Sequence, residues 1–171
     1  MPKLLVASYD NIANIVPARG IRMNTQRPEW NDANNALAGY GLSMVTLCYL
    51  RRYLVFLAGL VEQGNRNDFS VTREVAEYLE GIHEVLRKNT RVLGTGFTPE
   101  DRKSMMDDLG RISEAYRDSA YAGFSGELSV LESSELLAFM DLTGAYLDQS
   151  ITHNRRVDGL FHSYNLVEFR D

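Results

Sequence analysis

Residues 35–63 read NALAGYGLSMVTLCYLRRYLVFLAGLVEQ, and this stretch decides the fold class that the sequence predicts. When it is drawn as a helix, apolar residues occupy most of its sides, which is typical of a helix surrounded by other helices. Gly64 follows directly and is a common residue at a helix end, and the polar residues 65–68 after it read as a loop. The sequence therefore predicts one long core helix over residues 35–63.

The most apolar part of this stretch, residues 42–61, is also long enough to cross a membrane. Arg51 and Arg52 stand in its middle, where each would cost about 2.5–3.5 kcal/mol at the centre of a bilayer. A buried helix is therefore the favoured interpretation, with Arg51 and Arg52 in structural ion pairs or directed into a cleft. The N-terminal residues carry only a very short apolar run, so we expect no signal peptide, no membrane partner and a cytoplasmic location.

Three further helices are predicted downstream, each from an apolar stripe at helical spacing. Ser70 and Ser133 can cap the first and the last of them. Thr98 begins the middle one, because a cap, a proline and two acidic residues follow one another there. We expect these helices over residues 70–88, 98–121 and 133–152.

At the two ends of the chain, apolar residues follow no sustained helical or strand spacing. Residues 1–34 read mostly as loop, with one short helical turn near residues 11–16, because prolines, glycine and polar residues interrupt any periodicity. Residues 153–171 read as a tail, either a short strand or an extended loop. No alternation of strands and helices is visible, which argues against a doubly wound nucleotide fold. The predicted fold class is all-α, a single domain over residues 1–171 with four helices in antiparallel αα-hairpins over residues 35–152.

Composition excludes several classes of protein. The 171 residues carry a net charge of −5, which argues against a nucleic-acid partner, since phosphate backbones need clustered Lys and Arg. Cys48 is the single cysteine, so no intrachain disulfide and no multi-cysteine zinc site can form. No zinc, calcium or phosphate-loop spacing occurs in the sequence, so no metal is expected.

The densest group of functional side chains lies in residues 27–35, which read RPEWNDANN. The segment holds two carboxylates, several side-chain amides and Trp30, the only tryptophan. A flat apolar ring beside carboxylates and amides suits a sugar, whose hydroxyl groups need hydrogen-bond partners. The alternative is a capping cluster in which Asp32 or Asn34 caps the long helix.

Residues 30–35, Trp-Asn-Asp-Ala-Asn-Asn, resemble the Trp-Asn-Asp-Gly-Met-Asn segment of cellobiose phosphorylase and related inverting glycan phosphorylases. The resemblance implies a six-hairpin (α/α)₆ toroid and a carbohydrate-active enzyme, a glycoside phosphorylase or hydrolase. It implies that Asp32 is the general acid that protonates the glycosidic oxygen. Trp30 and Asn31 would line the sugar site, and the neighbouring Glu29 and Asn35 complete the candidate substrate-binding residues. The resemblance is specific over residues 27–37.

A phosphorylase of this kind needs no cofactor, and inorganic phosphate is its co-substrate in place of water. The tail residues 154–166 look similar to a later loop of these enzymes. This region contains the one cluster of arginine and histidine side chains in the sequence. The cluster could bind phosphate, or it could simply complement the dipole of a helix end. The candidate phosphate-binding residues are His153, Arg155, Arg156 and His162.

A complete toroid needs twelve helices, so four helices correspond to a partial toroid segment. Such a segment would leave apolar faces exposed, and we expect a homo-oligomer or association with the remainder of a larger toroid. The substrate would be an oligosaccharide or glycoside. The competing interpretation is a non-catalytic helical module for protein interaction or self-association.

Overall fold

The structure is a computed structural model and describes residues 2–23 and 36–168 of the chain. Of these, 64% are helical and 15% lie in strands that form two small antiparallel sheets. The fold is therefore mixed, and the prediction of an all-α chain of antiparallel αα-hairpins forming part of an (α/α)₆ toroid was wrong. A short strand was one of the two alternatives for the tail, where β6 forms, but the other strands were not predicted. Most of the strands are two or three residues long, too short to show a period of two.

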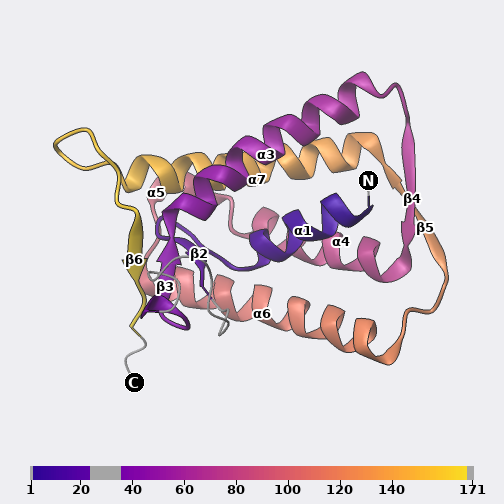
Figure 1. Cartoon of the computed structure of the whole chain (residues 1–171), viewed down its shortest axis with the longest axis horizontal. Helices are drawn as coiled ribbons and strands as arrows, with labels where there is room; N and C mark the ends of the chain where they lie inside the picture. The colour runs from indigo at the N-terminus through magenta and orange to yellow at the C-terminus, as the bar shows by residue number, and fades with distance from the viewer. Residues whose placement is uncertain (1, 24–35, 169–171) are drawn as a thin grey trace.

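The helices run between a small sheet at one end and a two-stranded ribbon at the other (Figure 1). Helix α3 packs along α7, helix α4 packs along α6, and α1 contacts α3, α4 and α6. The described helices are α1 (Pro2–Ala13), α3 (Met44–Gln63), α4 (Arg73–Lys88), α5 (Arg91–Thr95), α6 (Pro99–Ala122) and α7 (Ser133–His153).

The small sheet has four antiparallel strands, β1 (Ile15–Val16), β2 (Gly20–Arg22), β3 (Gly41–Ser43) and β6 (Tyr164–Leu166), in the order β1-β2-β3-β6. The ribbon pairs β4 (Asp68–Thr72) with β5 (Leu128–Glu132). In β4, Phe69 and Val71 are buried, while Asp68 and Ser70 are exposed. This alternation is that of a strand with one buried face, so Ser70 is a strand residue and not the predicted helix cap.

Two helix starts and one predicted cap differ from their predictions. The described residues 2–23 are not mostly loop, because α1 covers Pro2–Ala13 and two strands follow it. Helix α3 begins at Met44, since Gly41–Ser43 pairs in the sheet, and the Ser43 side chain caps the helix by accepting a hydrogen bond from the Thr46 amide at 3.0 Å. Helix α7 begins at Ser133 as expected, but its hydroxyl donates to the Arg66 carbonyl at 2.6 Å and caps nothing.

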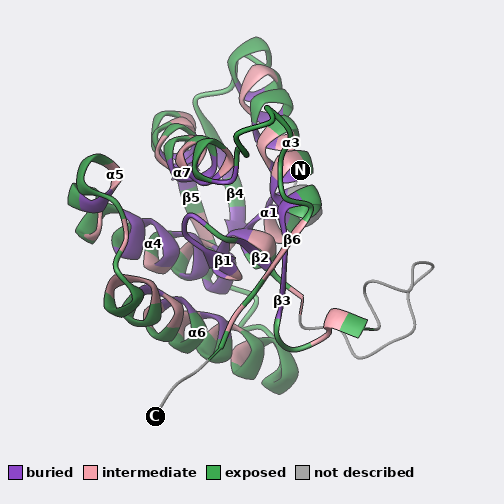
Figure 2. Ribbon diagram, turned by 90° about the vertical axis from the view of Figure 1, so that its left-hand side faces the viewer, coloured by how far each residue is buried: buried purple, intermediate pink, exposed green. Residues whose placement is uncertain are grey.

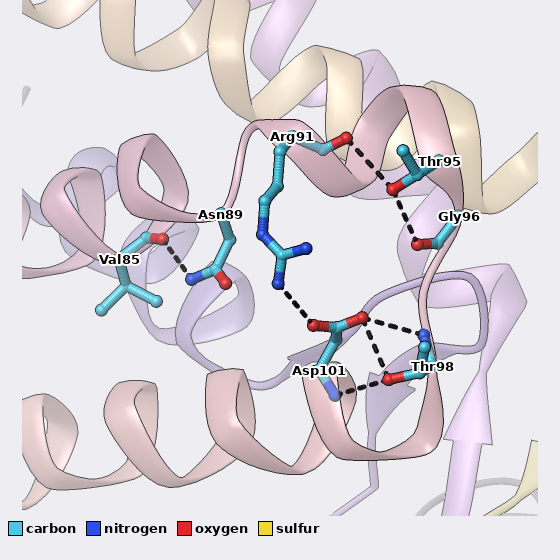
Figure 3. A network of polar contacts seen from close by, with 7 residues as sticks. All are labelled: Val85, Asn89, Arg91, Thr95, Gly96, Thr98 and Asp101. Carbon is cyan, nitrogen blue, oxygen red and sulfur yellow. Dashed lines mark hydrogen bonds and ion pairs between the residues drawn. The ribbon is translucent and has the colours of Figure 1, made fainter.

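The predicted start of α6 is confirmed, and Figure 3 shows the polar contacts around it. The Thr98 hydroxyl accepts a hydrogen bond from the Asp101 amide, and the Asp101 carboxylate accepts one from the Thr98 amide, both at 3.1 Å. This reciprocal pair is a capping box. The hydrogen bonds from Thr98 hold the pKa of the Asp101 carboxyl below its ordinary value, and Arg91, at 3.1 Å from that carboxylate, adds to the effect.

One core joins the helices and both sheets, and its buried segments lie at the centre of the molecule in Figure 2. Aromatic rings occupy the middle of this core: Phe139 meets Tyr9 edge-on at 5.5 Å between ring centroids and meets His83 at 5.4 Å. Burial lowers the pKa of His83, so the ring is held neutral. His83 therefore acts as part of the core.

Helix α3 has one buried and one exposed apolar face. Leu47, Leu50, Leu54, Leu57 and Val61 are buried in the core. The outer face carries a stripe, which we call the α3 stripe, made up of Val45, Tyr49, Phe56 and Leu60. Of the helices that the structure describes, α3 is the one long and apolar enough to cross a membrane by length and composition, and 33% of its most apolar window is buried. Arg51 at its middle makes a bidentate ion pair with Asp148 of α7, at 2.7 and 2.9 Å.

Candidate functional site

In the sequence, the segment with the sugar-site motif falls between β2 and β3, which are neighbouring strands of the small sheet. The candidate residues Glu29, Trp30, Asn31, Asp32 and Asn35 fall outside the described residues. The strand before them, β2, pairs with the strand after them, β3, with Ile21 opposite Ser43 and Arg22 opposite Leu42. The Met23 amide extends this pairing by donating to the Gly41 carbonyl at 2.9 Å. The sheet therefore holds the two flanks of the motif side by side.

The C-terminal tail forms the next strand of the same sheet. Strand β6 pairs with β3, with Leu42 opposite Asn165 and Ser43 opposite Tyr164. The Met44 amide, at the start of α3, donates to the Ser163 carbonyl at 3.0 Å. The strand that follows the Trp30–Asp32 segment and the C-terminal tail, far apart in sequence, are thus adjacent in one sheet.

A hydrogen-bonded asparagine pair, Asn154 and Asn165, fixes this arrangement. Asn154 is buried at the end of α7, and its amide group donates to the carbonyls of Ala18 and Ser150 at 2.9 and 2.8 Å. The Asn165 amide group donates to the Asn154 side-chain oxygen at 2.7 Å and to the Arg19 carbonyl at 2.5 Å. The β1–β2 turn, α7 and β6 therefore share one hydrogen-bond network. Sequence reasoning missed these residues, because no local pattern marks an amide whose partners lie elsewhere in the chain.

The four candidate phosphate-binding residues lie at the end of α7 and along the exposed loop that follows it. His153 is the last residue of α7, and Arg155 bridges to Phe161 across the loop. The His162 amide donates to the Asn154 carbonyl at 3.2 Å, which brings His162 back beside the helix end. Arg156 forms an ion pair with Asp158 at 2.8 Å, so part of its charge is already compensated.

A surface groove with a cavity volume of ≈260 Å³ lies where this loop meets α3. Tyr49, Cys48 and Arg52 line it from α3, and Phe161, His162 and Ser163 line it from the tail. The Arg52 guanidinium lies 5.8 Å from the centre of the Tyr49 ring. Burial raises the pKa of the Cys48 thiol, so it stays protonated and is a poor nucleophile.

The groove, which we call the α3–tail groove, can bind a polar ring but offers little chemistry of its own. An exposed tyrosine ring provides an apolar face, and His162, Ser163 and Arg52 provide hydrogen-bond donors at its edge. No carboxylate from the part of the chain that the structure describes lines it. In the described ranges, 2–23 and 36–168, no three His, Cys, Asp or Glu side chains are placed to hold a metal ion. The groove therefore suits binding, and a general acid would have to come from outside its lining.

Comparison with known proteins gives no match, either to a protein-family model or to a curated protein.

Proposed function

We propose that this chain is a carbohydrate-active protein that binds an oligosaccharide or glycoside beside the small sheet, with Asp32 as the general acid. The observation that carries the proposal is the pairing of β3 with β6. It joins the flank of the Trp30–Asp32 segment to the tail that lines the α3–tail groove. The resemblance of both stretches to inverting glycan phosphorylases supports the same conclusion.

The capping alternative for Asp32 is weakened by the start of α3. The sequence allowed Asp32 or Asn34 to cap the long apolar helix, but Ser43 caps it instead. Neither residue is therefore needed to begin α3. A sugar-binding site still accounts for the acidic and amide side chains that this segment contains.

In the proposed reaction, the Asp32 carboxyl group donates its proton to the glycosidic oxygen as the bond to the anomeric carbon breaks. The nucleophile attacks that carbon from the opposite face of the ring. If the nucleophile is inorganic phosphate, the product is a sugar 1-phosphate, and if it is water, the product is a reducing sugar. Assay of both products with a panel of oligosaccharides distinguishes phosphorolysis from hydrolysis.

Trp30 allows binding to be measured directly, because it is the only tryptophan in the chain. We expect its fluorescence to change in a saturable manner as an oligosaccharide is added. Tyr49→Ala removes the ring of the α3–tail groove and should weaken this binding several-fold, since aromatic contacts contribute about 0.5–1.5 kcal/mol. Tyr121→Ala is the matched control, because Tyr121 is an exposed tyrosine of α6 outside the groove. An unresponsive Trp30, or equal weakening by the two variants, would contradict the proposed site.

A second function, self-association through α3, is favoured by a separate observation. The α3 stripe exposes Tyr49, Phe56 and Val45 to 65%, 60% and 42% of their surface, and Leu60 extends it by a turn. Aligned apolar side chains of this kind mark association surfaces. Because a homodimer interface is self-complementary, a second copy of α3 is the occupant that we propose.

Phe56→Glu is expected to convert such a dimer into a monomer, because it places a charge at the centre of the α3 stripe. Light scattering at micromolar concentration measures the change, and Tyr121→Glu is the control for an added charge on another exposed aromatic position. A monomeric unmodified protein, or a dimer that survives Phe56→Glu, would exclude this interface.

A further inference from the structure

A second site is indicated on the face where the β1–β2 turn meets α6. The two elements are joined by Arg102 of α6, whose Nε donates to the Pro17 carbonyl at 3.2 Å. Burial lowers the pKa of Arg102, and the positive charge of nearby Arg19 adds to the effect. Arg22, in β2, and Arg117, on α6, belong to the same pair of packed elements. In a chain whose net charge is −5, four arginines therefore lie on the β1–β2 hairpin and on α6.

Arg22 and Arg117 line one cavity, which has a volume of ≈130 Å³ and which we call the arginine cavity. Its wall on α6 consists of Met106, Gly110, Ser113 and Arg117, at spacings of four, three and four residues along one face of the helix. Asn14 and Arg22 face them from the β1–β2 side, and among the described residues no carboxylate lines the cavity.

Neither arginine has an acidic partner in the part of the chain that the structure describes. Most other basic side chains there do have one, for example Arg51, Arg73 and Arg91. Asp10 lines the neighbouring groove together with Arg117, and both charges act on Tyr78, but Asp10 forms no ion pair with Arg117 among the described residues. The side chains of Arg22 and Arg117 thus line one small cavity without an ion-pair partner in the described part of the chain, and an anion is the ligand that would compensate their charges.

The guanidinium group selects the kind of anion. Its planar array of N–H donors matches the oxygens of a phosphate group, to which it can donate two parallel hydrogen bonds. Ser113 contributes little to the ligand, because its hydroxyl already donates to the Leu109 carbonyl at 2.9 Å and lies 3.2 Å from the Tyr78 hydroxyl. The recognition therefore rests on Arg22 and Arg117. We propose that the arginine cavity binds a phosphate group, either as free phosphate or as a phosphate monoester.

The neighbouring groove explains why both forms have to be tested. It has a volume of ≈690 Å³ and shares Ser113 and Arg117 with the arginine cavity. Tyr78 and Tyr116, stacked at 4.3 Å between ring centroids, line this groove together with Phe124. An apolar or aromatic group attached to a phosphate held at Arg117 could therefore pack against these rings.

The site is argued from arginines of the described fold and does not depend on the carbohydrate proposal. It also differs from the phosphate site predicted from sequence, since His153, Arg155, Arg156 and His162 lie outside its lining. Its test needs no sugar, so the outcomes for the two proposals are independent.

Isothermal titration of the whole chain with inorganic phosphate, at constant ionic strength in chloride, tests the proposal. We expect saturable binding of one phosphate and a loss of affinity of about tenfold or more in both Arg22→Gln and Arg117→Gln, because a hydrogen-bonded charge pair is removed. Arg66→Gln is the matched control. Arg66 is exposed, also has no acidic partner among the described residues, and lies over the Phe69 ring, outside the arginine cavity.

Gly110→Leu tests the cavity without changing any charge. A Cβ atom at Gly110 would meet no other atom within 4 Å, so the substitution is expected to leave the fold intact while it fills the space between the two arginines. Phosphate binding should be lost as the melting temperature is retained.

A parallel titration with phenyl phosphate distinguishes the two sources of the phosphate group. Tighter binding of phenyl phosphate than of phosphate, with the difference abolished by Tyr116→Ala, assigns a monoester, and equal binding assigns free phosphate. The proposal is overturned if phosphate does not bind, if Arg66→Gln weakens binding as much as Arg22→Gln, or if Gly110→Leu leaves the affinity unchanged.

Discussion

Asp32→Asn is expected to lower the turnover of an oligosaccharide substrate by about 10²–10⁴-fold, which is the usual contribution of general acid catalysis. The amide cannot donate the proton that the leaving oxygen needs, although it keeps the shape of the side chain. An aryl glycoside with an acidic phenol as leaving group should be largely spared, because that group departs without protonation. The measurement is the rate of product release for both substrates at saturating concentration.

Asp118→Asn is the matched control, since Asp118 is an exposed aspartate of α6. It should leave both rates unchanged. The capping interpretation makes a different forecast for Asp32→Asn, because Asn caps a helix as well as Asp does. Unchanged turnover of both substrates, with an unchanged melting temperature, would therefore remove Asp32 from the catalytic assignment.

Phe139→Ala is expected to lower the free energy of unfolding by about 3–5 kcal/mol, the cost of replacing a fully buried phenylalanine by alanine. Phe139 is completely buried, and its ring contacts Tyr9 and His83. These partners come from α1 and α4, so the cavity would open where three helices meet. Denaturation in urea at a fixed protein concentration measures the loss.

Phe161→Ala is the control for the loss of an aromatic side chain. Phe161 lies in the C-terminal tail and is 47% exposed, so its removal should cost less than about 1 kcal/mol. Equal losses for the two variants would show that the interior around Phe139 is not packed as described.

The helices were the most predictable part of the fold, and α6 shows why. Its start depends on residues that are neighbours in sequence: Thr98 as cap, Pro99 in the first turn and Asp101 as the reciprocal partner. The information is local, so the pattern and the structure agree. The same holds for the stripe of α4, whose buried residues include Val75, Leu79 and Ile82 as the spacing indicated.

Apart from the short strand that was one alternative for the tail, the strands could not be predicted, because most of their partners are distant in sequence. Gly41–Ser43 reads as a continuation of the apolar helix, and only its pairing with β2 and β6 makes it a strand. In residues 128–132 of β5, apolar and polar residues alternate only weakly. The turn residues that precede them make this alternation hard to recognise in the sequence. The error in fold class therefore came from reading short segments by local periodicity alone.

The candidate sites, like the helices and strands, differ in how far local sequence could identify them. The Trp30–Asp32 segment was found from its own residue types, and its assignment remains a prediction. The arginine cavity was not found, because Arg22 and Arg117 become neighbours only when the β1–β2 turn packs on α6. A local sequence pattern can identify a compact motif, whereas it contains no signal for a site assembled from separate elements.

The hydrogen bonds of the asparagine pair have a consequence for the order in which the protein folds. They link residues 136 and 146 positions apart, Asn154 to Ala18 and Asn165 to Arg19, whereas the capping box of α6 links neighbours. Contacts that close long loops carry the larger entropic cost and form late. The small sheet should therefore be completed last on refolding and open first under mild denaturation. The same sheet holds both flanks of the Trp30–Asp32 segment. Under mild denaturation the proposed sugar site would therefore be lost while most helices remain folded.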